Sequence, residues 1–223
     1  MNDYGLGSYA QEGEDILLKR IFEYRNINDG GFYVDVGAHH PQRFSNTYFF
    51  YKRGWKGINI DATPGSMKLF NELRERDINL EFAVSDKQET LTYYMFNEPA
   101  LNSFDKELSL KRNLLEHYSI LETKNINTIT LENILDKYLP KNQDIDFLSI
   151  DVEGFDFQVL KSNNWEKYSP KVVLIEILSK DIESMIGSEV YIYMKKLNYK
   201  YYAKSVHTHF FIKEDFFDFR FSS

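Results

Sequence analysis

The sequence predicts an α/β fold around an open, mostly parallel β-sheet, and two patterns lead to that prediction. Short apolar runs rich in β-branched and aromatic residues recur along the chain, which is typical of strands buried on both faces. Amphipathic segments with helical spacing separate these runs, as in folds that alternate strands and helices. We expect helices near residues 11–24, 67–76, 129–139, 156–168 and 182–199. We expect strands near 32–36, 57–60, 78–86, 147–150, 171–176, 200–206 and 209–217, and a strand or edge hairpin over 89–96.

Length and composition fit a single globular domain over residues 1–223, with a helical N-terminal segment over residues 1–28. The 27 basic and 34 acidic residues give a net charge of −7, which argues against an extended nucleic-acid surface. The absence of Cys excludes disulfides, thiolate metal sites and cysteine nucleophiles. Because we find neither a secretory signal pattern nor an apolar run of membrane-spanning length, we expect a cytoplasmic protein of undetermined oligomeric state.

The segment from Gly31 to His40 is the centre of the predicted fold. Its apolar strand ends at Asp35 and Gly37, and Ala38 follows, so small residues let the backbone approach a ligand closely. Ligands of open α/β sheets bind just beyond the carboxyl ends of the strands. The alternative is a buried strand that ends in an ordinary turn.

A polar loop follows this strand and carries His39, His40, Arg43 and Asn46. Because loops after strands often carry chemistry, we assign His39 to catalysis and the other three residues to acceptor binding. The alternative for a loop histidine is a surface or hydrogen-bonding role. Two adjacent histidines point in different directions, so we do not expect them to clamp a metal together.

Two further strand ends are acidic. Asp61 follows the second strand, where nucleotide-binding folds hold ribose hydroxyls, or it merely terminates the strand. Asp151 and Glu153 are two residues apart, so an extended backbone points them to the same side. Such a pair can act as a general base, as metal ligands or as orienting acceptors. Alternatively, Glu153 and Asp156 are only the acidic start of the next helix.

Residues 97–127 are the least regular part of the sequence and mix polar residues with scattered Leu. We expect a helical insertion or lid there, and a loop of this kind near a site often sets substrate choice. We expect the two C-terminal strands to be adjacent, one of them antiparallel. Their aromatic side chains are expected in the core, since a nucleic-acid surface would interleave them with Lys and Arg.

Five motifs that occur in register carry a family resemblance. SYAQEGED, GFYVDVGAHHP, SNTYFFYKRGWKGINIDATP, FAVSD and DFLSIDVEGFDFQVL together resemble the FkbM-type S-adenosylmethionine-dependent methyltransferases, from about residue 8 to residue 176. The resemblance implies a class I, Rossmann-like fold, which is a doubly wound, mostly parallel seven-stranded sheet with helices on both faces. It also implies O-methylation of a hydroxyl on a sugar (a polysaccharide or nucleotide sugar) or on a natural product.

The resemblance further implies cofactor-binding roles for Asp35, Gly37, Ala38, Asp61, Ala62, Ser85, Asp86 and Asp151. The first three would hold the methionine part, Asp61 and Ala62 the ribose, and Ser85 and Asp86 would lie beside the adenine. The sequence departs from the family in two places. His39 replaces the second Gly of the fuller glycine motif, and Asp61 with Ala62 stands where many members have Glu-Pro.

Two other functions fit a similar fold: an NAD(P)-dependent oxidoreductase and a non-catalytic nucleotide-binding module. Pyrophosphate binding needs the later glycines of G-x-G-x-x-G, and the residues after Gly37 lack them. The intact Asp35, Asp61 and Asp151 argue against a module without catalysis. A sulfonium cofactor has no pyrophosphate, so the methyltransferase interpretation is favoured.

A methyltransferase must align an acceptor hydroxyl with the methyl–sulfur bond and take its proton. The candidate bases are His39, Asp151 and Glu153, and an imidazole is the better match because its usual pKa lies closer to neutral pH. Asp151 would then orient the acceptor or His39. Alternatively, Asp151 and Glu176 end neighbouring strands and share a divalent cation, although the sequence shows no third clear ligand.

Overall fold

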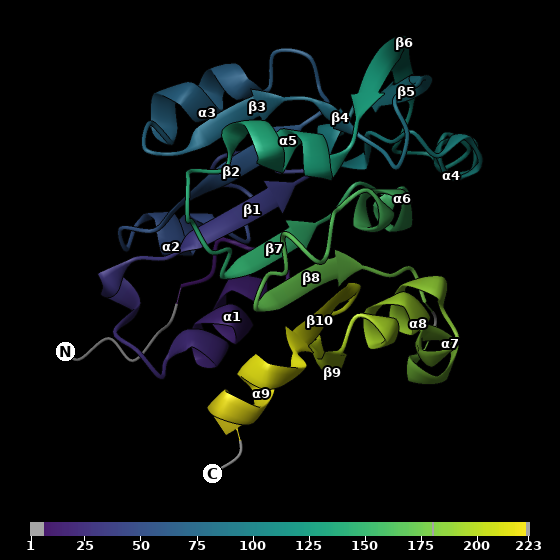
Figure 1. Cartoon of the computed structure of the whole chain (residues 1–223). Coiled ribbons are helices and arrows are strands. Elements are labelled where there is room, and N and C mark those ends of the chain that lie inside the picture. The colour runs from purple at the N-terminus through teal and green to yellow at the C-terminus, as the bar shows by residue number, and fades with distance from the viewer. Residues whose placement is uncertain (1–6, 180, 222–223) are drawn as a thin grey trace, which may run out of the picture.

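Seven strands form one sheet in the computed structural model, which describes residues 7–179 and 181–221 (Figure 1). Their order is β3-β2-β1-β7-β8-β10-β9, and the bounds are β1 (Phe32–Val36), β2 (Lys56–Asp61), β3 (Ile78–Glu81), β7 (Phe147–Ile150), β8 (Val172–Glu176), β9 (Tyr199–Lys204) and β10 (Thr208–Lys213). The strands from β3 to β8 are parallel, and β10 is antiparallel to both of its neighbours. The predicted seven-stranded, mostly parallel sheet is confirmed.

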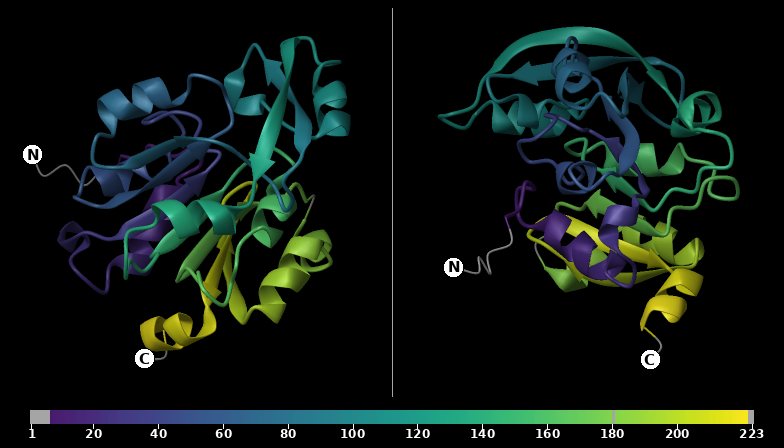
Figure 2. Two further views of the ribbon diagram at one scale, coloured as in Figure 1. Left: turned by 45° about the horizontal axis from the view of Figure 1, so that its top comes forward. Right: turned by 90° about the vertical axis from the view of Figure 1, so that its left-hand side faces the viewer.

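Successive side chains of the central strands pack into two cores, one on each face of the sheet. Val34 and Val36 lie in one core with residues of α5 (Leu131–Tyr138), α6 (Asp156–Lys161), α7 (Ile182–Ile186) and α8 (Glu189–Lys196). Tyr33, which directly precedes Val34, lies in the other core with α1 (Glu14–Phe22), α2 (Tyr48–Tyr51) and α9 (Glu214–Phe221). Helices therefore cover both faces, and elements from the two ends of the chain share the second core (Figure 2).

A second, three-stranded sheet has the order β4-β6-β5, with β4 (Ala83–Val84), β5 (Thr90–Phe96) and β6 (Ile120–Ile129). The segment between β5 and β6 carries η2 (Pro99–Leu101) and α4 (Lys106–Arg112), and we call residues 97–119 the insertion. In Figure 1 it lies on the side towards which the arrows of β1, β7 and β8 point. The remaining elements are α3 (Met67–Leu73), between β2 and β3, and η1 (Ile27–Asp29), before β1.

Several predicted boundaries are corrected. Residues 78–84 form two short strands that belong to different sheets, not one strand. Residues 120–129 form a regular strand, although their polar composition predicted an irregular segment; β6 pairs with β5 away from the core, so few of its side chains are buried. The last predicted strand ends at Lys213, and α9 follows it. In the N-terminal segment the first helix begins at Glu14, and residues 1–6 lie outside the described residues.

Candidate active site

The order of the sheet places a crevice at the carboxyl ends of β1 and β7, because the chain proceeds outward in opposite directions from these two neighbours. Gly37 ends β1 with a φ of 86°, which favours glycine. A Cβ atom on Gly37 would lie 1.7 Å from the backbone oxygen of Asp151, just beyond β7. The glycine is therefore required by the approach of two strand ends of the protein itself, whereas the sequence alone suggested the approach of a ligand.

Two adjoining pockets open at this crevice. The inner pocket is lined by Val36, Gly37, His39, Ile60, Asp61, Ala62, Phe82, Val84, Tyr93, Pro99, Ala100, Asn102, Phe104, Asp151, Val152, Glu153 and Phe155. The outer pocket is lined by Gln11, Glu12, Glu14, Gly37, His39, Phe44, Asn46, Ala100, Asp151, Glu153, Glu176, His207 and Thr208. Five of these residues line both pockets, so a group bound in one can meet a group bound in the other.

Asp61 lies at the end of β2 and is held by backbone donors. The amide of His39 donates to its Oδ2 at 2.9 Å, and the amide of Thr63 donates to its Oδ1 at 2.7 Å. An ionised carboxylate has about four acceptor sites, so lone pairs remain for a ligand. The Thr63 hydroxyl lies 3.0 Å from the Tyr93 hydroxyl, which connects Asp61 to the opposite wall of the inner pocket.

That opposite wall is aromatic. The ring centroids of Tyr93 and Phe104 are 4.6 Å apart, and those of Phe104 and Phe155 are 5.9 Å apart. Burial raises the pKa of the Tyr93 hydroxyl well above its usual value, so the ring stays neutral. A set of apolar rings opposite a carboxylate suits a ligand with a flat ring at one end and hydroxyl groups beside it.

Three carboxylates converge where the pockets meet. One oxygen each of Asp151, Glu153 and Glu176 lies within 4.8 Å of the others. Asp151 keeps surface accessible to the pocket, but its surroundings are poorly solvated, and this burial together with the charge of Glu153 raises its pKa. Burial and the neighbouring Asp151 raise the pKa of Glu176 to about 10. The three groups are therefore not all ionised together at neutral pH.

The loop after β7 is held in an unusual conformation. Glu153 has a φ of 57°, in the left-handed region that non-glycine residues rarely adopt. Asp156 accepts hydrogen bonds from the amides of Val152 at 3.1 Å and Gly154 at 3.0 Å, and burial raises its pKa to about 7. From the insertion, Arg112 forms an ion pair with Glu153. Asp156 thus shapes the loop, in addition to starting the following helix.

His39 lies between the pockets and also has a left-handed backbone, with a φ of 52°. Burial lowers the pKa of its imidazole, a change that the charge of Asp61 opposes. Its Nε2 atom is buried and has no hydrogen-bond partner among the described residues. A neutral imidazole with a free nitrogen at the junction of two pockets can accept a proton from a bound hydroxyl group.

Other residues with predicted cofactor roles lie elsewhere. The Asp35 side chain points beneath β1, where it accepts a hydrogen bond from the Thr47 hydroxyl at 3.2 Å. Ala38 packs against α3. Ser85 is fully buried, and Asp86 forms an ion pair with Lys161 at 2.8 Å. The structure brings none of these four side chains to the described lining of either pocket, whereas Ala62 does line the inner pocket.

The predicted acceptor-binding residues are also divided. Asn46 lines the outer pocket and donates to the Ser149 hydroxyl at 3.1 Å. Arg43 forms a two-point ion pair with Glu98, with distances of 3.2 and 3.1 Å, so its charge is already matched. His40 turns its Nδ1 atom toward the loop backbone, where it accepts from two amides, and does not line the outer pocket.

Sequence reasoning missed the outer wall of the site. Gln11, Glu12 and Glu14 belong to a segment that we predicted only as the start of a helix near residues 11–24, and acidic residues are common at the start of a helix. His207 and Thr208 lie at the turn between β9 and β10, where no local pattern marks a ligand. No sequence pattern marks Tyr93 and Phe104 either, because the smaller sheet and the insertion bring them together only in the folded protein.

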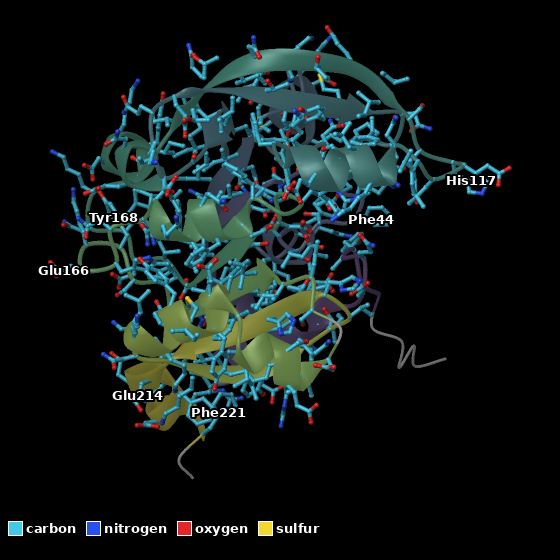
Figure 3. All side chains as sticks on the ribbon, turned by 90° about the vertical axis from the view of Figure 1, so that its right-hand side faces the viewer. Phe44, His117, Glu166, Tyr168, Glu214 and Phe221 are labelled. Carbon is cyan, nitrogen blue, oxygen red and sulfur yellow. The ribbon has the colours of Figure 1, made fainter. Side chains whose placement is uncertain are left out.

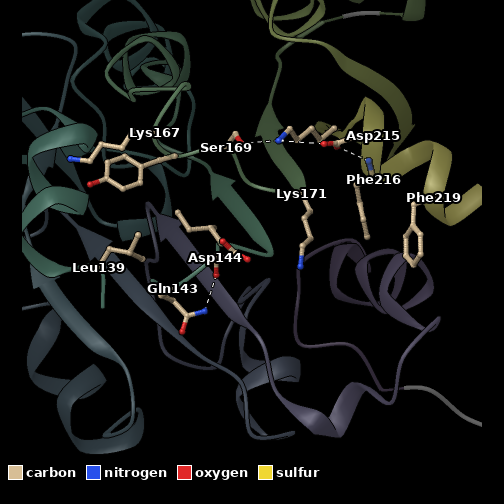
Figure 4. A pocket seen from close by; sticks show the side chains of 12 residues that line it. Leu139, Gln143, Asp144, Lys167, Ser169, Lys171, Asp215, Phe216 and Phe219 are labelled. Atoms are coloured by element: carbon tan, nitrogen blue, oxygen red, sulfur yellow. Dashed lines mark hydrogen bonds and ion pairs between the residues drawn. The ribbon is translucent and has the colours of Figure 1, made fainter. Parts of the chain in front are cut away.

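A larger hollow lies at the amino ends of β7 and β8, opposite the crevice (Figure 4). Three lysines line it, and each is already paired. Lys171 lies 2.7 Å from Asp146, Lys167 lies 2.5 Å from Asp136, and Lys213 contacts the Ser169 hydroxyl at 3.1 Å. Because ligands of open α/β sheets bind at the carboxyl ends, we assign the active site to the two smaller pockets.

A comparison with protein families shows the family of this chain. The sequence model of the methyltransferase FkbM domain matches residues 35–201, which include both acidic strand ends and the whole insertion. The chain belongs to the FkbM methyltransferase family. It is therefore an S-adenosylmethionine-dependent methyltransferase, and the alternatives of an oxidoreductase and a non-catalytic module are set aside.

No curated protein matches this FkbM methyltransferase significantly. Within residues 7–179 and 181–221, every helix is too short or too polar to span a bilayer.

Proposed function

We propose that this FkbM methyltransferase transfers a methyl group to a hydroxyl oxygen of a sugar or natural-product acceptor. The observation that carries the proposal is the junction of the two pockets, where His39 and three carboxylates meet beside the cofactor crevice. The inner pocket would hold S-adenosylmethionine and the outer pocket the acceptor. The cofactor and the acceptor need adjoining pockets, since the methyl group passes directly from the cofactor to the acceptor.

The residues of the inner pocket fit the cofactor. Asp61 keeps lone pairs for the ribose hydroxyls, and the rings of Tyr93, Phe104 and Phe155 suit the adenine. Gly37 lines both pockets at the strand end, where the methionine part would lie. In this proposal the side chains that contact the adenine come from the smaller sheet, the insertion and the loop after β7, not from Ser85 and Asp86.

When bound, the cofactor supplies a methyl group already activated on a positively charged sulfur. Asp61 and the aromatic wall would hold the cofactor, and an acceptor hydroxyl in the outer pocket would receive its methyl group and leave S-adenosylhomocysteine. The hydroxyl proton passes to Nε2 of His39. This nitrogen is neutral at neutral pH because burial lowers the pKa of the imidazole, and it has no partner in the described chain to displace.

The three carboxylates have a second interpretation. The sequence offered Asp151 and Glu176 as ligands for a divalent cation, and the structure adds Glu153 as a third carboxylate nearby. Without a cation, Glu176 is protonated at neutral pH and can donate a hydrogen bond to the acceptor. If EDTA abolishes the activity and Mg²⁺ restores it, a bound metal and not His39 activates the acceptor hydroxyl.

Calorimetry with S-adenosylhomocysteine tests the cofactor site. The Asp61→Ala variant removes the proposed ribose acceptor and should weaken binding by about 1–3 kcal/mol, the usual value of hydrogen bonds to a charged group. Asp144→Ala, which removes an exposed carboxylate at the opposite end of the sheet, should bind as the wild type does. Equal affinity of the folded Asp61→Ala variant would exclude this role, and binding of NAD in place of S-adenosylhomocysteine would overturn the proposed function.

A further inference from the structure

The outer pocket has an unusual charge. Its described lining includes five carboxylates, those of Glu12, Glu14, Asp151, Glu153 and Glu176, and no Lys or Arg. The nearest arginines are already matched, because Arg112 pairs with Glu153 and Arg43 pairs with Glu98. An acceptor that carries a phosphate or carboxylate would meet five acidic side chains in this pocket, with the imidazoles of His39 and His207 as its only ring-nitrogen partners in the described lining, and this excess of acidic groups disfavours its binding.

Two of these carboxylates form a wall built by the N-terminal segment. Glu14 is only 2% exposed, and it accepts hydrogen bonds from the Ser205 hydroxyl at 2.6 Å and from the amide of Glu12 at 2.9 Å. These bonds fix the carboxylate at the pocket without supplying a positive charge. The charge of Glu14 reaches the catalytic centre, since it contributes to raising the pKa of Asp151.

The cofactor can balance only part of this negative charge. Asp151 lines both pockets, so the positive sulfur of S-adenosylmethionine can serve as its counter-charge, and Glu153 is already paired with Arg112. Glu12, Glu14 and Glu176 line the outer pocket and not the inner one. The Oε2 atom of Glu176 is buried and has no partner among the described residues. Glu14 already accepts two hydrogen bonds, so the groups left to the acceptor are Glu12 and Glu176. A positive group of the acceptor would pair with Glu12 and would favour the ionised form of Glu176.

An aromatic ring completes the pocket. Phe44 is 40% exposed, and its φ of 57° is a costly conformation for a residue with a side chain (Figure 3). That conformation places the ring at the pocket, with its centroid 6.3 Å from that of His39. Exposed aromatic rings in a polar pocket offer an apolar surface for the C–H groups of a sugar ring.

We propose that the acceptor is an amino sugar bound as its ammonium form, with its ring against Phe44 and its ammonium group against Glu12 and Glu176. The ammonium group has three donors for the carboxylate oxygens. A hydroxyl of the same ring then faces His39 and Asp151, where it receives the methyl group. This inference rests on the proposed function, and it narrows the acceptor from any sugar to a cationic one.

The experiment compares three matched sugars on the protein saturated with S-adenosylhomocysteine. Methyl glucosaminide, methyl glucoside and methyl glucuronide share one ring and differ in charge. At mildly acidic pH, calorimetry should show the amino sugar binding roughly tenfold or more tightly than the neutral sugar, the ratio that one hydrogen bond to a charged group supplies. The glucuronide should bind more weakly than either, and added salt should reduce the preference for the amino sugar.

Variants assign that preference to the acidic wall. Glu12→Gln keeps the shape of the side chain and should bring the amino sugar close to the affinity of the neutral one, while the affinity for S-adenosylhomocysteine stays unchanged. Glu14→Gln is a second test that should act in the same direction if Glu12→Gln does not fold. Glu166→Gln changes an exposed carboxylate that lines neither pocket and should keep the wild-type preference (Figure 3).

Three results would overturn the inference. The glucuronide could bind as well as the amino sugar, the preference could survive in both Gln variants, or none of the three sugars could bind to the cofactor-loaded protein. In each case binding of S-adenosylhomocysteine would still stand, so the proposed function would not be affected. Loss of that binding in the wild type would instead contradict the proposed function itself.

Discussion

Asp35 in β1 and Asp61 at the end of the neighbouring β2 have different surroundings, and these surroundings indicate different roles. Asp61 receives two backbone amides at the mouth of the inner pocket. Asp35 lies beneath the same strand, is 5% exposed, and has the Thr47 hydroxyl as a partner. Although both follow apolar residues at strand ends, Asp61 faces the inner pocket and Asp35 faces the protein interior.

The pKa of Asp35 predicts a pH dependence of stability. Burial raises this pKa from 3.8 to about 6 in the folded protein. The folded state therefore favours the protonated Asp35, and this contribution to the free energy of unfolding is full below about pH 4 and is lost as the pH rises from about 4 to about 6. At 1.36 kcal/mol per pH unit, the difference amounts to roughly 3 kcal/mol. Urea unfolding of Asp35→Asn should show the variant gaining stability over the wild type between acidic and neutral pH. The exposed Asp144→Asn should show no such gain, and a pH-independent difference for Asp35→Asn would contradict the prediction.

His39 is predicted to act as the general base. His39→Ala should lower kcat by roughly 10²–10⁴-fold, the usual contribution of acid–base catalysis, with little change in the affinity for S-adenosylhomocysteine. Because burial lowers the imidazole pKa, the wild-type rate should fall only below the usual range for histidine. His117→Ala, at the exposed end of the insertion, is the matched control (Figure 3). Full turnover in His39→Ala would make Glu153 the next candidate.

Asp151 is predicted to be essential for methyl transfer in a different way. Asp151→Asn should still bind S-adenosylhomocysteine, because its backbone position beside Gly37 is unchanged, but it should lose most of its turnover. In this prediction the Asp151 side chain orients the acceptor or His39, or binds a cation, and the amide of Asn has neither the negative charge nor the second oxygen that these functions use. Single-turnover kinetics separate the two effects. Normal turnover in Asp151→Asn would remove Asp151 from the chemistry.

At the scale of the elements, the insertion is attached to the site by polar contacts. Arg112 of α4 pairs with Glu153, and the Ser103 hydroxyl donates to the backbone oxygen of Glu153 at 2.7 Å. Glu98 pairs with Arg43 on the other side of the crevice. The insertion also contributes lining residues to the inner pocket, so its position and the state of the site are coupled.

We predict that the insertion is the first segment to be cleaved in limited proteolysis, and that S-adenosylhomocysteine slows the cleavage. Contacts through a few polar side chains make local opening easier than in the cores. Arg112→Met should speed cleavage in the free protein, because it removes the ion pair with Glu153. Lys106→Met changes an exposed cation on the same helix and should not. Equal cleavage with and without the ligand would argue against a lid.

The extent to which sequence predicts these elements follows the burial of their side chains. The strands at residues 32–36 and 172–176 are buried on both faces, and their apolar runs predicted them well. The β6 strand pairs outside the core and carries polar residues, so no hydrophobic pattern marked it. In the site, Asp61 and Asp151 were found because strand ends are local features. Glu14 was not, since its contact with Ser205 spans 191 residues of sequence.

At the scale of the whole molecule, the carboxyl ends of the strands carry the pockets and the amino ends carry paired charges. Loops that belong to both halves of the chain meet at the carboxyl ends of β1 and β7 and form the two pockets. The amino ends are held by paired charges such as Lys171 with Asp146, and α1 and α9 join the chain termini over one face. A ligand that contacts loops from both halves of the chain at the carboxyl ends should therefore stabilise the fold. It should leave local opening at the amino ends of the strands unchanged.

Hydrogen exchange with S-adenosylhomocysteine tests this division. A ligand at 100 times its Kd adds about 2.7 kcal/mol to the stability of the folded state, which should raise the Tm. The slowing of exchange at low denaturant should be largest in residues 37–47, 61–65, 97–105 and 151–155, which surround the pockets, because local opening there breaks ligand contacts. Residues 139–146 and 167–171, at the opposite hollow, should exchange at their ligand-free rate. The folded Asp61→Ala variant should show the same pattern with a smaller effect at equal ligand concentration. Protection centred on the hollow would place the cofactor at the amino ends and contradict the assignment of the active site.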